Sequence, residues 1–365
     1  GLYNFTAVYE GTFRPKESGA YELLIEGDDG YRVYVNGEKV IDYWGEHASA
    51  KREYTLKAIA GTDYKIRIEY MQAGAEAVLR FDLGVYRHIS PEMVVDRVKE
   101  ADIVIFAGGI SPSLEGEEMY SVNSPGFAGG DRTSIELPQV QRDILKALKK
   151  AGKKVVFVNC SGSAVALVPE MESCDAILQA WYPGQAGGLA VADVLFGDFN
   201  PSGKLPVTFY KNTDQLPDFE DYSMKNRTYR YMTEVPLFPF GYGLSYTTFD
   251  ISKGRLNKKT ISAGQDLNFK VNVKNTGKYD GAEVIQVYVR KVDDAEGPIK
   301  SLRAFRRVPL KAGETCVVSI DLLPTTFEFF DPTTNTMRIM PGKYEIMYGN
   351  SSDIPSGNKL SVTLR

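Results

Sequence analysis

The sequence predicts a multidomain protein that joins α/β and all-β folds: a parallel-sheet α/β sandwich flanked by two antiparallel β-sandwiches. Three observations predict it. Apolar and polar residues alternate with the period of a strand up to about residue 84. Helical spacing, interrupted by short apolar runs, then continues to about residue 245, and alternation returns after it. We therefore expect domains over residues 1–84, 85–245 and 246–365.

The first stretch is expected to form an antiparallel sandwich. Its alternation is clearest over 21–25, 31–35 and 64–70, and turns rich in glycine and aspartate separate these runs. Asn36-Gly37 lies between two of the apolar runs. This dipeptide is typical of a type I′ hairpin, in which both central residues need positive φ.

The middle stretch alternates strands with helices. Ser90-Pro91-Glu92 predicts a helix start, because a hydroxyl side chain can cap the first amides and proline suits the first helical position. In a second helix, Val140, Ile144 and Leu148 are expected on one buried face. The predicted strands cover 103–107, 155–159 and 176–181, and the later helices cover 138–151 and 186–196. This alternation indicates a largely parallel sheet covered by helices.

The last stretch is again all β. Apolar residues alternate over 267–273, 285–289, 316–320 and 344–348, with glycine-containing turns between these segments. Strands at this regular spacing over about 120 residues are typical of an immunoglobulin-like or fibronectin-type-III sandwich.

The composition leaves carboxylates as the expected catalytic groups. The net charge of −4 gives no basic field for nucleic acid, and no apolar run has the length of a membrane span. Three cysteines lie far apart, and the two histidines, His47 and His88, stand in no motif of a metal site or catalytic triad. We expect no cofactor and no metal.

The segment from Gly108 to Pro138 is the candidate site. It leaves the end of a predicted parallel strand and runs for roughly thirty residues, and such long loops in compact domains are usually functional or disordered. It holds Glu115, Glu117, Glu118, Asp131 and Arg132. Crowded carboxyls can raise one another's pKa, so one can act as a general acid. The alternative is a solvated acidic loop. No phosphate-binding glycine motif is present.

Several motifs resemble a known family. FAGGISPSLEGEE (106–118), GGDRTSIELPQVQ (129–141), AWYPGQAGG (180–188) and FPFGYGLSYTTF (238–249) are similar to the second domain of family 3 glycoside hydrolases, in the same order. The last stretch resembles that family's fibronectin-type-III-like domain. The first resembles a protective-antigen-type β-module, which some β-glucosidases of the family carry inserted in the second domain.

The resemblance implies retaining hydrolysis of a terminal β-linked sugar, which uses a nucleophile and an acid/base carboxyl about 5–5.5 Å apart. In the family the nucleophile is an Asp on an N-terminal (β/α)8 barrel, and the acid/base Glu comes from the loop that 108–138 resembles. The motif favours Glu117 for that role, with Glu115 as second choice because E-x-E spacing lets the alignment shift by two. No segment has a barrel pattern, so we expect the nucleophile outside this chain and the chain alone to be inactive.

Other expectations stay open at this point. β-Glucosidase is the favoured activity, with β-xylosidase or a non-catalytic carbohydrate-binding or scaffold protein as alternatives. A β-linked oligosaccharide or glycoside is the expected ligand, and the missing barrel the expected partner domain. Trp44 and Trp181 are candidate substrate-binding residues, Trp44 as a sugar-stacking ring and Trp181 as a wall of the cleft, with core packing as the alternative for both. Asp28-Asp29 is either a calcium ligand or a capped turn. The resemblance implies a periplasmic or secreted protein.

Overall fold

The computed structural model describes residues 4–74, 77–85, 89–115, 125–128 and 131–365. The chain forms two compact units, Gly1–Ile89 and Ser90–Arg365. The three domain ranges expected from the sequence stay a prediction. The expected fold class is confirmed: a parallel α/β sheet lies between antiparallel sandwiches along the chain.

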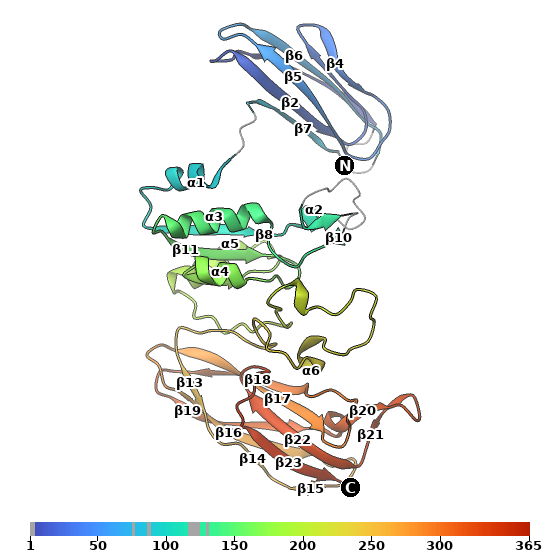
Figure 1. Ribbon diagram of the computed structural model, residues 1–365, viewed down its shortest axis with the longest axis vertical. Coiled ribbons are helices and arrows are strands. Elements are labelled where there is room, and N and C mark those ends of the chain that lie inside the picture. Colours follow the sequence, from blue (N-terminus) through green and yellow to red (C-terminus); the bar gives the residue numbers. More distant parts are fainter. Residues whose placement is uncertain (1–3, 75–76, 86–88, 116–124, 129–130) are drawn as a thin grey trace. The chain divides into compact units, whose positions relative to one another are not determined.

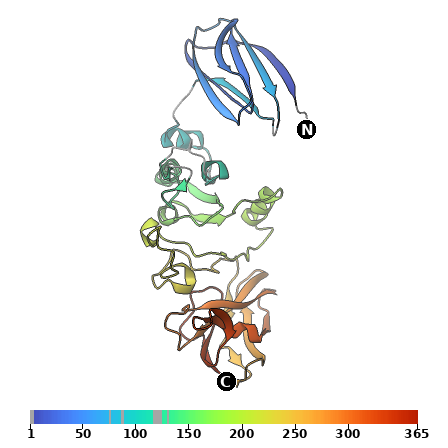
Figure 2. The ribbon, with the colours of Figure 1, turned by 90° about the vertical axis from the view of Figure 1, so that its right-hand side faces the viewer.

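The first unit is a sandwich of two antiparallel sheets, of strand order β1-β6-β3-β4 and β5-β2-β7 (Figures 1 and 2). Its strands are β1 (Phe5–Phe13), β2 (Gly19–Gly27), β3 (Tyr31–Val35), β4 (Glu38–Tyr43), β5 (Ala50–Ala58), β6 (Tyr64–Gln72) and β7 (Leu79–Gly84). The alternating residues fill one core between the sheets. Asn36 and Gly37, with φ of 51° and 86°, join β3 to β4, so the predicted type I′ turn is confirmed.

The α/β part has a parallel sheet of order β12-β11-β8 among the described residues. Its elements are α1 (Pro91–Arg97), β8 (Ile103–Gly109), α2 (Pro112–Glu115), β9 (Phe127–Ala128), β10 (Asp131–Arg132), α3 (Gln139–Lys150), β11 (Lys154–Cys160), α4 (Val168–Ser173), β12 (Ala176–Gln179), α5 (Gly187–Phe196) and α6 (Thr228–Tyr231). The predicted N-cap is confirmed, because the Ser90 side chain accepts a hydrogen bond from the Met93 amide.

Helix α3 contacts α1, α4 and β11, so these helices form one layer (Figure 1). Right-handed connections that step across the sheet in one direction place their helices on one face. The predicted buried face of α3 is confirmed in part: Leu148 is buried and Ile144 packs against the core, whereas Val140 is 53% exposed. Leu145, outside the predicted stripe, is also buried. On the opposite sheet face, Ile103 and Ile105 of β8 remain more than half exposed.

The C-terminal sandwich packs a five-stranded sheet, β15-β23-β22-β17-β18, against a sheet built on β16. Its strands are β13 (Phe249–Ile251), β14 (Arg255–Leu256), β15 (Thr260–Ile261), β16 (Leu267–Asn275), β17 (Gly281–Lys291), β18 (Ser301–Leu310), β19 (Thr315–Leu322), β20 (Glu328–Asp331), β21 (Thr336–Ile339), β22 (Gly342–Gly349) and β23 (Lys359–Leu364). All four predicted alternating segments are strands. The sequence reading missed the β20–β21 hairpin.

Candidate active site

The acidic loop starts from a fixed point at the end of β8. Gly109 has a φ of +126°, and a Cβ at this position would lie 1.9 Å from the carbonyl oxygen of Cys160. Only glycine fits such a position. The Gln141 side chain accepts from the Gly109 amide at 2.8 Å and donates to its carbonyl at 2.7 Å. The next residue, Ile110, is fully buried. The loop therefore begins from a rigid base.

Glu115, at the end of α2, is surrounded by donors. The Tyr182 hydroxyl lies 2.9 Å from its Oε2, and the Ser163 hydroxyl lies 3.3 Å from its Oε1. The guanidinium of Arg132 is 3.9 Å from Oε1. These partners come from three different connections of the α/β sheet, which meet at the carboxyl ends of the strands, where such sheets bind ligands.

Arg132 links Glu115 to the second half of the loop. Its guanidinium also donates to the Ser163 hydroxyl at 3.0 Å and to the Ser134 carbonyl at 3.2 Å. Its side chain is only 14% exposed, and Nη2 is buried without a hydrogen-bond partner among the described residues. Burial lowers the pKa of Arg132, and Glu115 acts in the opposite direction. The sequence placed Glu115 and Arg132 in one loop, and the structure brings them together.

Glu136 anchors the far end of the loop to the segment that follows the α/β core. Thr213 donates to it through both its amide, at 3.0 Å, and its hydroxyl, at 2.7 Å, and Ser134 donates from the other side. Burial alone would raise the pKa of Glu136, but these hydrogen bonds outweigh burial and lower it to about 2. Glu136 is therefore a structural carboxylate at neutral pH.

A cavity of about 700 Å³ opens beside Arg132 and is bounded by the segment that Glu136 anchors. Phe219 and Tyr222 lie on its rim and are 91% exposed. Arg227 and Asp221 supply polar groups, and the Arg227 guanidinium is braced by backbone carbonyls of the same loop. Sequence reasoning missed this cavity, although the aromatic residues after Leu216-Pro217 are a usable signal.

Glu117 and Glu118 lie outside the described residues. Asp131 is exposed in β10, paired with Ala128 of β9. Trp181 is partly buried and packs edge-on against Phe209, with ring centroids 6.1 Å apart. Trp44 lies in the first unit, 41% exposed, with the Arg32 guanidinium 4.4 Å from its ring centroid.

The acidic turn of the first unit uses its carboxylate internally. Asp29 is buried and accepts from the amides of Ala73 at 2.7 Å and His47 at 3.1 Å. Hydrogen bonding to the Ala73 amide is the main cause that lowers the pKa of Asp29. Both oxygens of Asp29 therefore accept hydrogen bonds from backbone amides. Of the two alternatives expected from the sequence, this arrangement corresponds to the capped turn. No set of three potential metal-ligating side chains converges within the described ranges.

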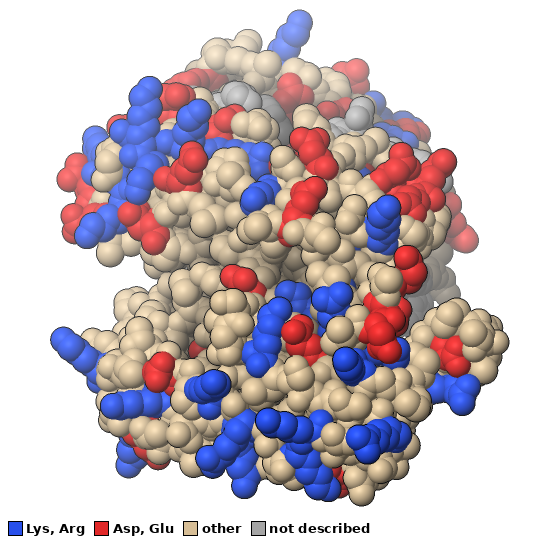
Figure 3. Space-filling model, turned by 60° about the horizontal axis from the view of Figure 1, so that its bottom comes forward, with Lys and Arg blue, Asp and Glu red and all other residues tan. Residues whose placement is uncertain are grey.

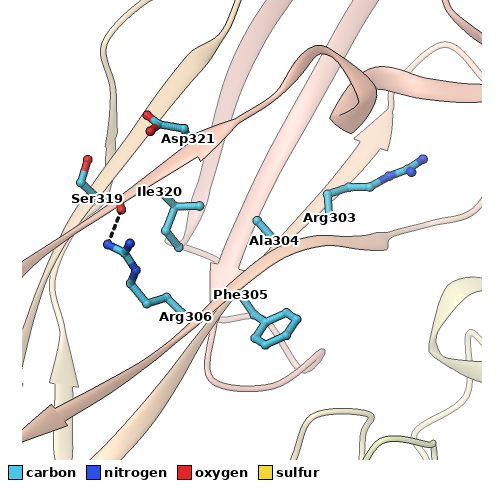
Figure 4. A pocket seen from close by; sticks show the side chains of 7 residues that line it. All are labelled: Arg303, Ala304, Phe305, Arg306, Ser319, Ile320 and Asp321. Carbon is cyan, nitrogen blue, oxygen red and sulfur yellow. Dashed lines mark hydrogen bonds between the residues drawn. The ribbon is translucent and has the colours of Figure 1, made fainter.

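A second cavity, of about 420 Å³, lies between β18 and β19 of the C-terminal sandwich (Figure 4). The Arg306 guanidinium reaches across it and donates to the Ser319 carbonyl at 2.8 Å, while Phe305 points away from Ser319. Lysine and arginine side chains gather over this end of the chain (Figure 3). The cavity holds one carboxylate, Asp321, so it lacks the paired acids of a glycosidase site.

Two family models match the chain. One, described as "Glycosyl hydrolase family 3 C-terminal domain", matches residues 28–246, and one described as "Fibronectin type III-like domain" matches residues 283–352. A xylan 1,4-beta-xylosidase of Xylanibacter ruminicola is 52% identical over the whole chain, which covers 42% of that relative. A periplasmic beta-glucosidase of Salmonella typhimurium is 38% identical, and the match covers 72% of this chain and 35% of that relative.

Solved structures give the same result. A beta-glucosidase from Kluyveromyces marxianus in complex with glucose superimposes with a TM-score of 0.78 at 28% identity, over 99% of this chain and 44% of that one. A beta-glucosidase from Listeria innocua in complex with isofagomine gives 0.61 at 31% identity, over 76% and 39%. The chain thus spans less than half the length of these relatives. None of the described helices is long and apolar enough to cross a membrane.

Proposed function

Because the chain belongs to glycosyl hydrolase family 3, whose C-terminal domain model matches residues 28–246, we propose that it is the C-terminal part of a retaining exo-β-glycosidase. In this proposal the chain supplies the acid/base carboxyl, and a (β/α)8 barrel of the same protein supplies the nucleophilic Asp. The family match carries the proposal. The relatives are about twice as long as this chain, which is consistent with a further catalytic domain.

Glu117 is the proposed acid/base residue. It would protonate the glycosidic oxygen while the nucleophile attacks the sugar, and then remove a proton from the water that releases the sugar. The surroundings of Glu115 support this choice: its two oxygens already accept from Tyr182 and Ser163, with Arg132 nearby.

The leaving group is proposed to lie on the side of the cavity next to Arg132, because the proposed acid belongs to the same loop of the sequence as Arg132. The exposed rings of Phe219 and Tyr222 suit stacking on a sugar. Trp181 packs against Phe209 and is proposed only as a wall of this region. Trp44 remains a proposed sugar contact of the first unit, with Arg32 over its ring.

Mutating Glu117 to Gln in the full-length protein tests the proposal. Loss of a general acid is expected to lower kcat/KM about 10²–10⁴-fold on glycosides with poor leaving groups, and much less on activated aryl glycosides. Glu118→Gln is the matched control and should leave both rates near those of the parent. If Glu117→Gln and the parent had equal rates on both substrates, Glu117 would be excluded as the acid/base residue. Collapse in Glu115→Gln alone would assign the role to the second choice.

β-Xylosidase is a second candidate activity, alongside the β-glucosidase expected from the sequence. One observation favours it: the relative that is 52% identical over the whole chain is named a xylan 1,4-beta-xylosidase, whereas the periplasmic beta-glucosidase of Salmonella typhimurium is 38% identical. The ratio of kcat/KM on aryl β-xyloside and aryl β-glucoside decides between them. No hydrolysis of either by the full-length protein would favour the non-catalytic alternative.

The remaining expectations are part of the same proposal. The first unit is proposed to be a protective-antigen-type module, and the protein to act outside the cytoplasm, in line with a relative named as periplasmic. The 365-residue chain alone is expected to release no sugar, because it would lack the nucleophile. A measurable β-glycosidase rate from the purified chain, abolished in its own Glu117→Gln variant, would contradict this.

A further inference from the structure

Tyr182 connects the two ends of the segment 110–115, with which the acidic loop begins. Its hydroxyl oxygen lies 2.8 Å from the carbonyl oxygen of Ile110 and 2.9 Å from Oε2 of Glu115. Ile110 is the buried first residue after β8, and Glu115 is the last residue of α2. One phenol therefore contacts both ends of the segment 110–115, from a position 67 residues away in the sequence.

The backbone reaches this position through a rare conformation. Trp181 has a φ of +57°, in the left-handed region that a bulky side chain seldom occupies. Such conformations persist only where the surroundings impose them, and they cluster at functional sites. Here the Trp181 ring packs on Phe209, which is almost fully buried, and the preceding Ala180 amide donates to the Asn159 carbonyl at 2.8 Å. These contacts turn the chain so that Tyr182 faces the loop.

The ring of Tyr182 packs directly against the backbone at Gly162, where no side chain intervenes. A Cβ on Gly162 would lie 2.6 Å from Cε2 of Tyr182, too close for any side chain. The neighbouring Ser163 donates to Glu115 and accepts from Arg132. The turn at 161–163 thus provides both the surface under the ring and a second donor to the carboxyl that the ring contacts.

The hydroxyl has one proton and two acceptors. Burial and the hydrogen bond to Glu115 raise the pKa of Tyr182, so the phenol keeps its proton. It can donate to an ionised Glu115. If Glu115 is protonated, the phenol proton can turn to the Ile110 carbonyl while the carboxyl donates to the phenol oxygen. The contact can therefore survive either protonation state of Glu115.

We propose that Tyr182 is a positioning residue, which fixes the start of the acidic loop so that the proton donor two residues beyond Glu115 meets the glycosidic oxygen. Trp181 and Gly162 set the position of its ring. The inference rests on the proposed function and deepens it. Tyr182 acts through the loop, and its loss should impair the step that needs the acid more than substrate binding.

Tyr182→Phe in the full-length protein removes the hydroxyl alone. Because misplacing a catalytic group costs rate steeply, we expect kcat on a disaccharide or alkyl glycoside to fall on the order of tenfold or more, with KM nearly unchanged. On an activated aryl glycoside the change should be less than about twofold, since that leaving group needs little protonation. Tyr246→Phe is the matched control, because the Tyr246 hydroxyl likewise donates to a backbone carbonyl, that of Val194, at 2.6 Å.

Gly162→Ala tests the positioning of the Tyr182 ring while leaving its hydroxyl group in place. The added methyl group should displace the ring and give the same selective loss, and the double variant with Tyr182→Phe should be no worse than either single one. Gly184→Ala, where a Cβ meets no atom within 4 Å, is its control. Equal losses on both substrates in Tyr182→Phe, or no loss, would overturn the inference. If Glu117→Gln keeps the parent's rates, the proposed function itself fails, whatever Tyr182→Phe does.

Discussion

At the scale of the residue, the Glu115 carboxylate is contacted by Arg132, from the same loop, and by the Tyr182 hydroxyl, from the segment after β12. Glu115 and Arg132 stand in one conspicuous loop, and their proximity follows from that loop. Tyr182 is 67 residues from Glu115, and no periodicity relates the two. The positive φ of Trp181 had no local signal, because glycine and asparagine are the residues that normally mark such positions. Tertiary packing alone sets these contacts.

Gly109 allows a residue-scale test of the loop base. Gly109→Ala should lower the free energy of unfolding by more than about 3 kcal/mol, because its Cβ would overlap the Cys160 carbonyl in the β8–β11 pair. Gly152 also has a positive φ, of +76°, but a Cβ there meets nothing within 4 Å, so Gly152→Ala should lower it by about 1 kcal/mol. Urea unfolding measures both. Equal losses would mean that backbone strain, and not the overlap, decides the cost.

At the scale of the element, periodicity and capping residues predicted most strands and helices, and the I′ hairpin followed from two residues. The buried face of α3 was less predictable. Its apolar residues spread over more than one stripe, and the neighbours of the helix decide which stripe is buried. Elements held by side-chain contacts, such as the 213–215 turn under Glu136, have no periodic signal at all.

Glu136→Gln tests how the loop end is anchored. The pKa of Glu136 is lowered from about 4.5 to about 2 in the folded protein, so the unfolded chain binds more protons between these values. The parent should therefore gain stability from Glu136 above about pH 4.5 and lose it as pH falls toward 2. The difference in free energy of unfolding between parent and variant should shrink over that window. A difference that stays constant from pH 7 to pH 3 would contradict the assignment.

At the scale of the whole molecule, the α/β part and the C-terminal sandwich belong to one compact unit, and buried polar contacts join them. The Lys204 ammonium lies 2.7 Å from a Glu283 oxygen, with both side chains largely buried. Glu283 also accepts from the Asn350 side chain at 2.9 Å. The sequence predicted both folds but not this junction, since lysine and glutamate 79 positions apart give no pairing signal.

Lys204→Met tests this junction. Removing one partner of a buried ion pair leaves Glu283 unpaired, and should lower the free energy of unfolding by about 3–5 kcal/mol. Lys258→Met, at an exposed position, should change it by less than about 0.5 kcal/mol. Chemical denaturation of the purified chain measures both. A loss in Lys204→Met no larger than in the control would mean that the pair contributes nothing to the unit.

We propose that this chain provides the proton donor and that another part of the protein provides the nucleophile. Mass spectrometry of full-length Glu117→Gln, incubated with an activated glycosyl fluoride, tests it most directly. Such a substrate needs no acid to react, but release of the sugar needs the base, so a covalent sugar–protein ester should accumulate. We predict that it maps to an aspartate peptide outside these 365 residues. An adduct on a peptide of this chain, or none at all, would contradict the account.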